Sequence, residues 1–412
     1  MIDPDALHVW HNQDLVGYLW RNQFGYLGFR YATDWIGRGG FPVSQSLHLR
    51  EEPHTPESGK AHHFFANLLP EGNVRAHIVR DLKIADSDFD LLRAIGGECA
   101  GALSILADDQ DPTSDYHYRR LDEAQLEKLI LRRGQIYAGE SEEDRPRLSL
   151  AGAQDKCPVL LRDDQFYLPQ ENAPSSHIFK FEITDYRHLP AYEVFTSWLA
   201  HAVGLPVVEL SLQHALNTHY ALITRYDRYF GTDDKVHRYH QEDFCQALGY
   251  SAAHKYQDGQ GPTFAQCLSL LRKVSTEPAV DTLNLLRWQI FNVLAGNSDG
   301  HAKNLSLLYD NAGQTRLAPF YDLVCTRAIE RVDTRLGFFV AKERLPSRIA
   351  EAHWQAFAKD CDVRPKFLLS LVEELQSALC EQIEPVRQEF EMAFGEYPAL
   401  QRVEQVIKKR CT

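Results

Sequence analysis

The spacing of hydrophobic and polar residues changes several times along this chain, and each spacing predicts a different kind of element. Near the amino terminus, apolar and polar positions alternate over short runs, as they do in half-buried strands. The runs 7–10 and 15–19 flank a polar His-Asn-Gln-Asp turn, which predicts a β-hairpin, and 24–31 predicts a third strand. Helical spacing follows, with helices expected at 62–69 and 86–95. The amino-terminal region is therefore expected to be rich in β-structure.

A polar, highly charged stretch at 108–147 comes next, and one helix at 121–132 is expected within it. Extended segments follow at 158–161 and 176–181, and apolar residues then recur at helical spacing from 189 to 203. Further strands are expected at 207–210, 220–223, 305–309 and 315–318. These segments predict a second region in which strands and a helix alternate.

The carboxy-terminal half is predicted to be mainly helical. From 241 to about 295 the apolar residues keep a helical spacing, and the last helix of this run leads into a polar loop at 297–304. After residue 322 the helical pattern resumes and continues nearly to the end of the chain.

The polar loop at 297–304 reads Asn-Ser-Asp-Gly-His-Ala-Lys-Asn. An Asp followed five residues later by an Asn is the spacing of a protein-kinase catalytic loop. In such a loop the Asp accepts the proton of the attacking hydroxyl and the Asn holds a magnesium ion. The predicted hairpin would return Asp322 to the side of Asp299 as a second metal ligand. Polar loops rich in Asp and Asn are nevertheless most often plain turns, so the pattern needs support from the rest of the chain.

Four weaker features precede this loop in the order that protein kinases use. The turn at 151–156 is built of small residues, which let backbone N–H groups approach phosphate oxygens closely. Lys180 lies in an extended run and Glu193 in the first turn of the following helix, where kinases pair a lysine with phosphates and with a carboxylate. The polar segment at 224–226 leaves a predicted strand, as a hinge that reads adenine would.

Each of these features has an ordinary alternative. A lysine such as Lys180 is usually an edge residue that points to solvent, and Glu193 can simply favour the helix amino terminus electrostatically. The small-residue turn is a weak signal by itself. Their joint occurrence in kinase order, with kinase-like gaps, carries the interpretation.

Composition limits the function classes. A chain of 412 residues with 44% hydrophobic composition can bury large cores, and two or three domains are expected. The formal net charge of −13 argues against a protein that binds nucleic acid alone, because phosphate neutralisation needs clustered Lys and Arg. The eight cysteines contain no Cys-x-x-Cys pair and are expected to be reduced thiols. Without a leader pattern or a long apolar run, a soluble cytoplasmic protein is expected.

Taken together, these residues resemble the HipA-type serine/threonine protein kinase toxins of bacterial toxin–antitoxin modules. The matching motifs lie at 64–72, 97–103, 149–156, 177–181, 225–228, 240–249, 297–304 and 318–322. They are spread over nearly the whole chain, and their combination is specific.

The resemblance implies an α+β, protein-kinase-like two-lobed fold with a β-rich amino-terminal subdomain and an all-helical carboxy-terminal lobe. The amino-terminal subdomain would span 1–107, a connector 108–147, a small-lobe-like region with the glycine-rich turn and the hinge 148–228, and the helical lobe 229–412. The resemblance also implies ATP and Mg²⁺, a HipB-like helix-turn-helix antitoxin that contacts DNA for both proteins, and a substrate in the translation machinery such as glutamyl-tRNA synthetase.

Roles follow for individual residues. Asp299 is expected to be the catalytic base, with Lys303 neutralising charge on the transferred phosphoryl group. Asn304 and Asp322 are expected to hold magnesium, and the resemblance makes Ser149 a site of autophosphorylation. The residues expected to bind ATP are Ala151, Gly152, Ala153, Gln154, Asp155, Lys156, Lys180, Glu193, Thr224, Arg225, Tyr226, His301 and Asn304.

The chain departs from the family pattern in two places. Thr224 stands where the family often has an acidic residue, with little expected effect because backbone atoms read adenine there. The acidic carboxy-terminal helices argue against direct contact between this chain and DNA. Two other functions remain open, a small-molecule kinase of the same fold and a non-toxic pseudokinase scaffold that binds an antitoxin. The intact Lys180, Asp299, Asn304 and Asp322 argue against the scaffold.

Overall fold

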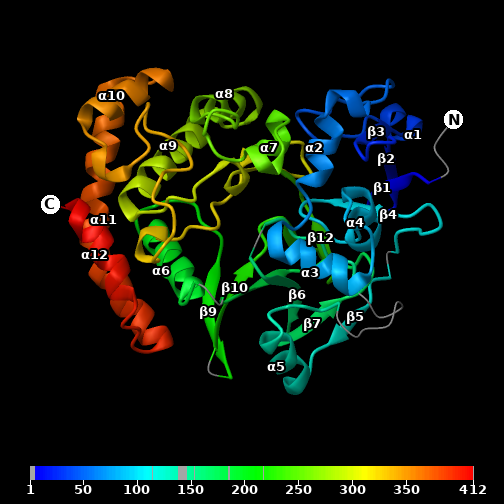
Figure 1. Cartoon of the computed structure of the whole chain (residues 1–412), viewed down its shortest axis with the longest axis horizontal. Helices are drawn as coiled ribbons and strands as arrows, with labels where there is room; N and C mark the ends of the chain where they lie inside the picture. Colours follow the sequence, from blue (N-terminus) through cyan, green and yellow to red (C-terminus); the bar gives the residue numbers. More distant parts are fainter. Residues whose placement is uncertain are drawn as a thin grey trace. The chain divides into compact units, whose positions relative to one another are not determined.

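The computed structural model describes residues 5–113, 115–137, 146–152, 154–183, 186–216 and 218–411, apart from the side chain of Cys411. By their internal contacts the residues form two compact units. The first unit contains Met1–Phe181, Thr224–Ala253 and Leu308–Asn311, and the second contains Glu182–Ile223, His254–Leu307 and Ala312–Thr412. Figure 1 traces the chain through both units by colour.

The first unit opens with an antiparallel sheet whose strand order is β3-β2-β1-β4. Its strands are β1 (Leu7–His11), β2 (Asp14–Arg21), β3 (Leu27–Tyr31) and β4 (Leu103–Leu106). The predicted hairpin is confirmed by the β1–β2 pairing. Strand β3 begins later than predicted, because the Asn22 side chain accepts hydrogen bonds from the N–H groups of Phe24 and Tyr26 and turns the chain there.

Short helices accompany this sheet. They are α1 (Thr33–Gly37), α2 (Lys60–Ala66), α3 (Gly72–Leu82) and α4 (Asp88–Ile95). The predicted helix at 86–95 is α4, and the Ser87 hydroxyl caps it by accepting a hydrogen bond from the Asp90 N–H group. Helix α3 was not predicted, because Ile78 is its only buried residue and the apolar periodicity is correspondingly weak.

The rest of the first unit adds strands and two helices. Strand β6 (Lys156–Arg162) pairs antiparallel with β7 (Gln165–Pro169) and with β8 (His177–Phe181), and β5 (Tyr118–Arg120) pairs with β7. The other elements are α5 (Glu123–Leu131), β11 (Arg228–Phe230), β12 (Val236–Arg238), β13 (His240–Asp243) and α7 (Phe244–Leu248). The prediction of helix from residue 241 is wrong for β13, since the helix begins only where Asp243 caps it.

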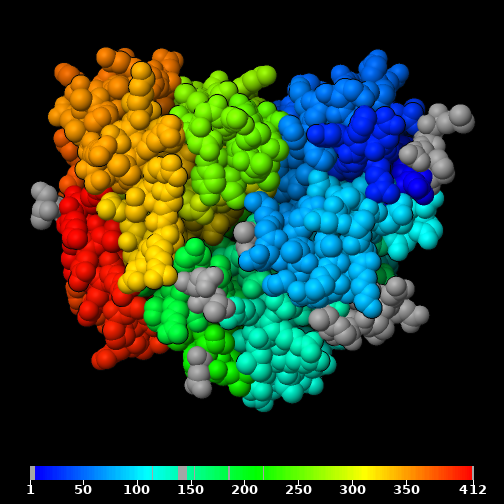
Figure 2. Space-filling view, viewed as in Figure 1, coloured from blue at the N-terminus to red at the C-terminus, as the bar shows by residue number. Residues whose placement is uncertain are grey.

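The second unit is mainly helical. Its helices are α6 (Leu189–Ala202), α8 (Phe264–Val274), α9 (Pro278–Ala295), α10 (Glu351–Asp360), α11 (Pro365–Phe394) and α12 (Leu400–Cys411). Helix α11 packs against α6, α9, α10 and α12. Residues of α10, α11 and α12, coloured orange to red, form one continuous surface in Figure 2.

Two hairpins lie mostly in this unit, although Thr224, Leu308 and Tyr309 belong to the first. Strand β9 (Leu210–Ala215) pairs with β10 (Thr218–Thr224), and β14 (Ser306–Tyr309) pairs with β15 (Thr315–Leu317), the latter where a hairpin was predicted. The strand predicted at 207–210 is displaced, because Val207 instead forms an isolated bridge with Phe320.

The cysteines can be compared with the reduced thiols that the sequence predicts. Six cysteines are buried free thiols, namely Cys99, Cys157, Cys245, Cys267, Cys325 and Cys361. Cys380 is disulfide-bonded, so the prediction of reduced thiols is wrong for this residue. Among the helices that the structure describes, none combines the length and the apolar character needed to cross a bilayer.

Candidate active site

The predicted catalytic loop lies in the second unit, directly after α9. Gly296 ends that helix with a left-handed φ of 75°, which glycine adopts without strain. The next residue, Asn297, is held by two bonds to Asn292, from its N–H group to the carbonyl oxygen at 2.9 Å and from Nδ2 to Oδ1 at 3.0 Å. The last turn of α9 therefore fixes where the loop begins.

The two residues of the kinase-like spacing are joined within this loop. Nδ2 of Asn304 donates to the carbonyl oxygen of Asp299 at 3.0 Å. Because the amide nitrogen is used in this way, Oδ1 is the atom of Asn304 that can ligate a metal. Asp299 is exposed, whereas Ser298, His301, Lys303 and Asn304 are buried. The loop is thus a fixed frame that presents one carboxylate to solvent.

Tyr256 contacts this carboxylate and was not identified from the sequence. Its hydroxyl donates to Oδ1 of Asp299 at 2.6 Å, and its ring meets the His301 ring edge-on with centroids 5.0 Å apart. Tyr256 precedes Asp299 by 43 positions in a segment between two helices, and no local spacing points to it.

The β14–β15 hairpin brings Asp322 toward the loop through its neighbour Tyr321. The Tyr321 hydroxyl donates to the carbonyl oxygen of Lys303 at 2.8 Å and hydrogen-bonds the Ser306 hydroxyl at 2.8 Å. Asp322 itself has a φ of 58°, in the left-handed region that non-glycine residues rarely adopt. Such backbone strain is typically about 1–3 kcal/mol and gathers at functional sites. Within the described ranges, no group of three or more His, Cys, Asp or Glu side chains forms a metal site.

The glycine-rich turn lies in the first unit and folds back on Lys156. Nζ of Lys156 donates to the Ala151 carbonyl oxygen at 2.6 Å. Gly152 has a left-handed φ of 111°, and a Cβ atom there would lie 2.8 Å from Nζ of Lys156. A larger residue would therefore both strain the backbone and displace the lysine. Ala153, also predicted to bind ATP, lies outside the described residues.

Lys156 and Lys180 are direct partners in the β6–β8 pairing. Directly opposed residues of an antiparallel pair place their side chains on the same face of the sheet, where like charges destabilise each other. Lys180 is 7% exposed, so water screens its charge poorly. The register places the two lysines side by side, and their binding of ATP stays a prediction.

Gln154 and Asp155 attach the turn to the end of β8. Nε2 of Gln154 donates to the carbonyl oxygen of Phe181 at 3.0 Å, and the Asp155 carbonyl oxygen accepts from the Phe181 N–H group at 3.1 Å. Burial raises the pKa of the Asp155 carboxyl above its usual value, and His77 and Arg133 oppose that change.

Ser149 is fully buried just before the turn. Its hydroxyl donates to the Leu68 carbonyl oxygen at 2.8 Å, and its N–H group donates to the Glu98 carbonyl oxygen at 2.8 Å. The hydroxyl is therefore inaccessible to a kinase in this conformation.

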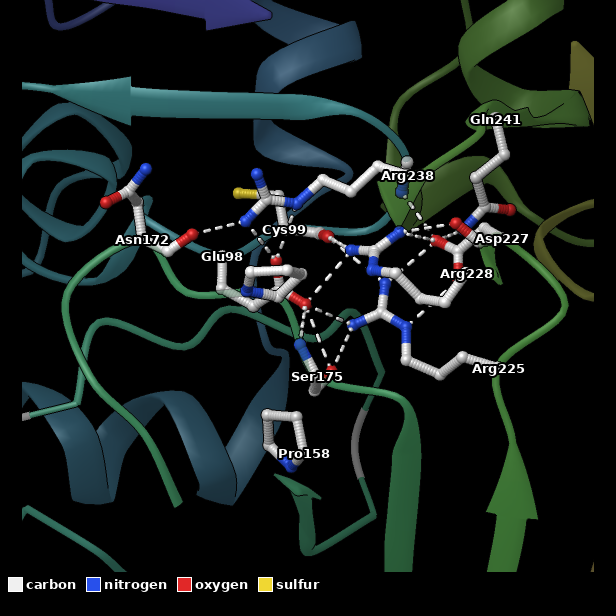
Figure 3. A network of polar contacts seen from close by, with 12 residues as sticks. Glu98, Cys99, Pro158, Asn172, Ser175, Arg225, Asp227, Arg228, Arg238 and Gln241 are labelled. Carbon is white, nitrogen blue, oxygen red and sulfur yellow. Dashed lines mark hydrogen bonds and ion pairs between the residues drawn. The ribbon is translucent and has the colours of Figure 1, made fainter. Parts of the chain in front are cut away.

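The predicted hinge leads into a buried cluster of charges (Figure 3). Thr224 is the last residue of β10, and the N–H group of Arg225 donates to the Ser176 carbonyl oxygen at 3.0 Å. The Arg225 side chain pairs with Glu98 at 2.9 Å and with Asp227 at 2.8 Å. The Tyr226 hydroxyl bonds the Gln241 side chain. The predicted contact of 224–226 with ATP concerns backbone atoms and stays a prediction, while the Arg225 side chain belongs to the buried cluster.

Glu98 is the centre of this cluster. Arg228 and Arg238 contact it at 3.0 and 2.8 Å in addition to Arg225, and all of these side chains are buried. Burial alone would raise the pKa of Glu98, but the three arginines outweigh burial and lower that pKa to about 2. The backbone of Glu98 also forms an isolated β-bridge with Leu148, the residue before Ser149. Glu98 therefore connects the amino-terminal region with the hinge and with the segment that leads into the glycine-rich turn.

Glu193 and Lys180 belong to different units. Glu193 lies on α6 and is 1% exposed, and Lys180 lies on β8. Their pairing stays a prediction.

Comparison with known proteins adds independent evidence. Residues 7–106 match the HipA N-terminal domain, and residues 148–383 match the HipA-like C-terminal domain. The protein Y4mE of Sinorhizobium fredii is 38% identical over 367 residues, which cover 87% of this chain and 86% of that protein. The serine/threonine-protein kinase toxin HipA of Shewanella oneidensis is 29% identical over 360 residues, or 82% of this chain and 79% of the toxin.

A solved structure agrees with these matches. HipA from the Shewanella oneidensis MR-1 complex of HipA, HipB and operator DNA superposes with a TM-score of 0.83 at 25% identity. The match covers 98% of this chain and 96% of that HipA chain. The predicted kinase-like α+β fold is therefore confirmed. Both domain matches, the relatives and the superposition agree, and this chain belongs to the HipA family of serine/threonine kinase toxins.

Proposed function

We propose that this chain transfers the γ-phosphate of ATP to serine residues of a protein of the translation machinery, for example an aminoacyl-tRNA synthetase such as glutamyl-tRNA synthetase. The observation that carries the proposal is the hydrogen-bonded pair of Asp299 and Asn304 in a buried frame. A scaffold would need neither this pair nor the left-handed backbone at Asp322.

Each of the predicted site residues has a role in the proposed phosphoryl transfer. Lys156, Lys180 and the backbone of the turn at 151–152 hold the phosphates of ATP, and the backbone of 224–226 contacts adenine. Asn304 and Asp322 offer the oxygen ligands that Mg²⁺ prefers, and the ion would neutralise charge on the phosphates. Asp299 accepts the proton of the serine hydroxyl, and Lys303 compensates charge on the transferred group.

Autophosphorylation of Ser149 is part of this proposal. A phosphate would add about −1.5 to −2 charges to a residue that is now fully buried. Burying that charge among backbone carbonyl groups is unfavourable, so the segment would leave its place and the adjacent turn would uncover the nucleotide. Mass spectrometry of active protein is expected to find phosphate on Ser149, and the Asp299→Asn variant is expected to lack it. Active protein without this phosphate would contradict the proposal.

A HipB-like antitoxin is the proposed partner, because the similar HipA structure was solved with HipB and operator DNA. The net charge of −13 supports contact with DNA through the antitoxin and not through this chain.

The direct test is incubation of the purified chain with radiolabelled ATP, Mg²⁺ and a bacterial extract. Label is expected on serine residues of one or a few proteins, and the Asp299→Asn variant serves as the matched control. Label found only on small molecules would favour a small-molecule kinase, and absence of transfer would favour a scaffold.

A further inference from the structure

The loop that carries Tyr256 is anchored on both sides of this residue. The Lys255 carbonyl oxygen accepts a hydrogen bond from the N–H group of Ala302, inside the catalytic loop, at 3.1 Å. On the other side, the Gln257 N–H group donates to the Gly337 carbonyl oxygen at 2.9 Å, and Oε1 of Gln257 accepts from the Phe264 N–H group at 3.2 Å. Tyr256 is therefore held between two fixed neighbours.

Gly261 closes this loop behind Tyr256. A Cβ atom on Gly261 would lie 2.0 Å from the carbonyl oxygen of Tyr256 and 2.4 Å from that of His254, and real Cβ atoms do not approach backbone so closely. The chain can pass so near to Tyr256 only because this residue is glycine. This close packing holds the backbone of Tyr256 in place.

We propose that Tyr256 is a positioning residue for phosphoryl transfer, whose phenol holds the carboxylate of Asp299 in one orientation. This inference rests on the proposed kinase activity. Asp299 is exposed, and an exposed carboxylate without such a contact would rotate among several rotamers. The bond of 2.6 Å holds Oδ1 and so limits the rotation of the carboxylate.

The proposed transfer exchanges one bond to the γ-phosphorus for another. The serine oxygen forms a bond to the γ-phosphorus of ATP while the bond from that phosphorus to the bridging oxygen breaks. The serine proton passes to Asp299, ADP leaves with the electron pair of the broken bond, and Tyr256 keeps its own proton throughout. An ionised carboxylate offers about four lone-pair sites on its two oxygens, so it can accept from the phenol and from serine together.

The matched variants are Tyr256→Phe, which removes only the hydroxyl and keeps the ring against His301, and Tyr18→Phe, which removes a hydroxyl from the amino-terminal sheet. With the full chain and Mg-ATP, Tyr256→Phe is expected to lower kcat by about tenfold to a hundredfold. The KM for ATP and the affinity for a non-hydrolysable analogue are expected to stay within a factor of about two, since the phenol contacts the base and not the nucleotide. Tyr18→Phe is expected to match the parent protein.

A double-mutant cycle separates positioning from a general structural effect. Added to Asp299→Asn, the Tyr256→Phe change is expected to have no further effect, because its influence passes through the Asp299 carboxylate. An unchanged kcat in Tyr256→Phe would overturn the proposal. So would a raised kcat, which would mean that the phenol blocks the acceptor, or phosphate on Tyr256, which would make it a substrate. If the parent protein transferred no phosphate from ATP to protein, the proposed function itself would fail, whatever the result at Tyr256.

Discussion

Two groups of charged residues differ in how their charges are exposed and neutralised. They are the Glu98 cluster of the first unit and the 297–304 loop of the second. In the cluster, every ionised side chain is buried and its charge is met by an opposite one at about hydrogen-bond distance. In the loop, backbone and amide groups are bonded inside a frame while the Asp299 carboxylate stays exposed. Charge that is neutralised within the protein serves structure, and charge that is held but left accessible can serve chemistry.

The largest effect is expected at Asp299. Replacing it with Asn keeps an acceptor for the Tyr256 hydroxyl but removes the base, so phosphoryl transfer is expected to fall by about a thousandfold or more. The thermal midpoint is expected to move little because the side chain is exposed. Transfer rates and melting curves of the purified variant check both statements. Substantial residual activity would remove Asp299 from the role of base.

The opposite result is expected at Glu98, where the effect is on stability. Glu98→Ala would remove the carboxylate that pairs with Arg238 and would leave Asp227 as the acidic partner of Arg225 and Arg228. Losing one partner of a buried ion pair typically costs about 3–5 kcal/mol. Denaturant unfolding is the measurement, with Glu209→Ala as the control because Glu209 is exposed. If both variants unfold at the same denaturant concentration, the cluster does not stabilise the fold as argued.

The same contrast explains which features the sequence could predict. The β1–β2 hairpin, α4, α6 and the β14–β15 hairpin follow from local spacing and capping, and they lie where predicted. The loop at 297–304 was found because its chemistry needs residues at a fixed local distance. Glu98 and Tyr256 were missed because their partners lie far away in the sequence, with Glu98 separated from Arg225 by 127 positions and Tyr256 from Asp299 by 43. The ion pair of Arg225 with Glu98 could not be predicted for the same reason, because no local spacing connects the two residues.

Glu242 is a second buried carboxyl group that can be compared with Glu98. It has no arginine partner in the described contacts. It accepts from the Ser44 hydroxyl at 2.5 Å and the Gln45 N–H group at 2.9 Å, and it also bonds the Tyr309 hydroxyl. Burial raises the pKa of Glu242 to about 7, and these hydrogen bonds oppose the rise.

A carboxyl whose pKa is higher in the folded state binds its proton more tightly there. Glu242 therefore contributes stability at acidic pH, and that contribution is lost as the pH rises toward about 7. The change is expected to be on the order of 3 kcal/mol. Unfolding free energies at pH 5 and pH 8 measure it, and the Glu242→Gln variant is expected to lose less stability over that interval. Equal pH dependence in the two proteins would rule out Glu242 as the cause.

The smallest effect on stability is expected at the pair of Lys156 and Lys180, where a substitution should act mainly on nucleotide binding. Lys156→Met removes the bond to the Ala151 carbonyl oxygen but also removes the like charge opposite Lys180, so the two changes in unfolding free energy partly cancel. The free energy of unfolding without ligand is expected to change by less than about 1 kcal/mol. Affinity for Mg-ATP is expected to fall by about tenfold, because a charge-assisted bond to phosphate is lost. Calorimetric titration with a non-hydrolysable analogue tests this, and Lys60→Met on α2 supplies the control. If Lys156→Met binds the nucleotide as tightly as the control does, the opposed lysines are not a phosphate site.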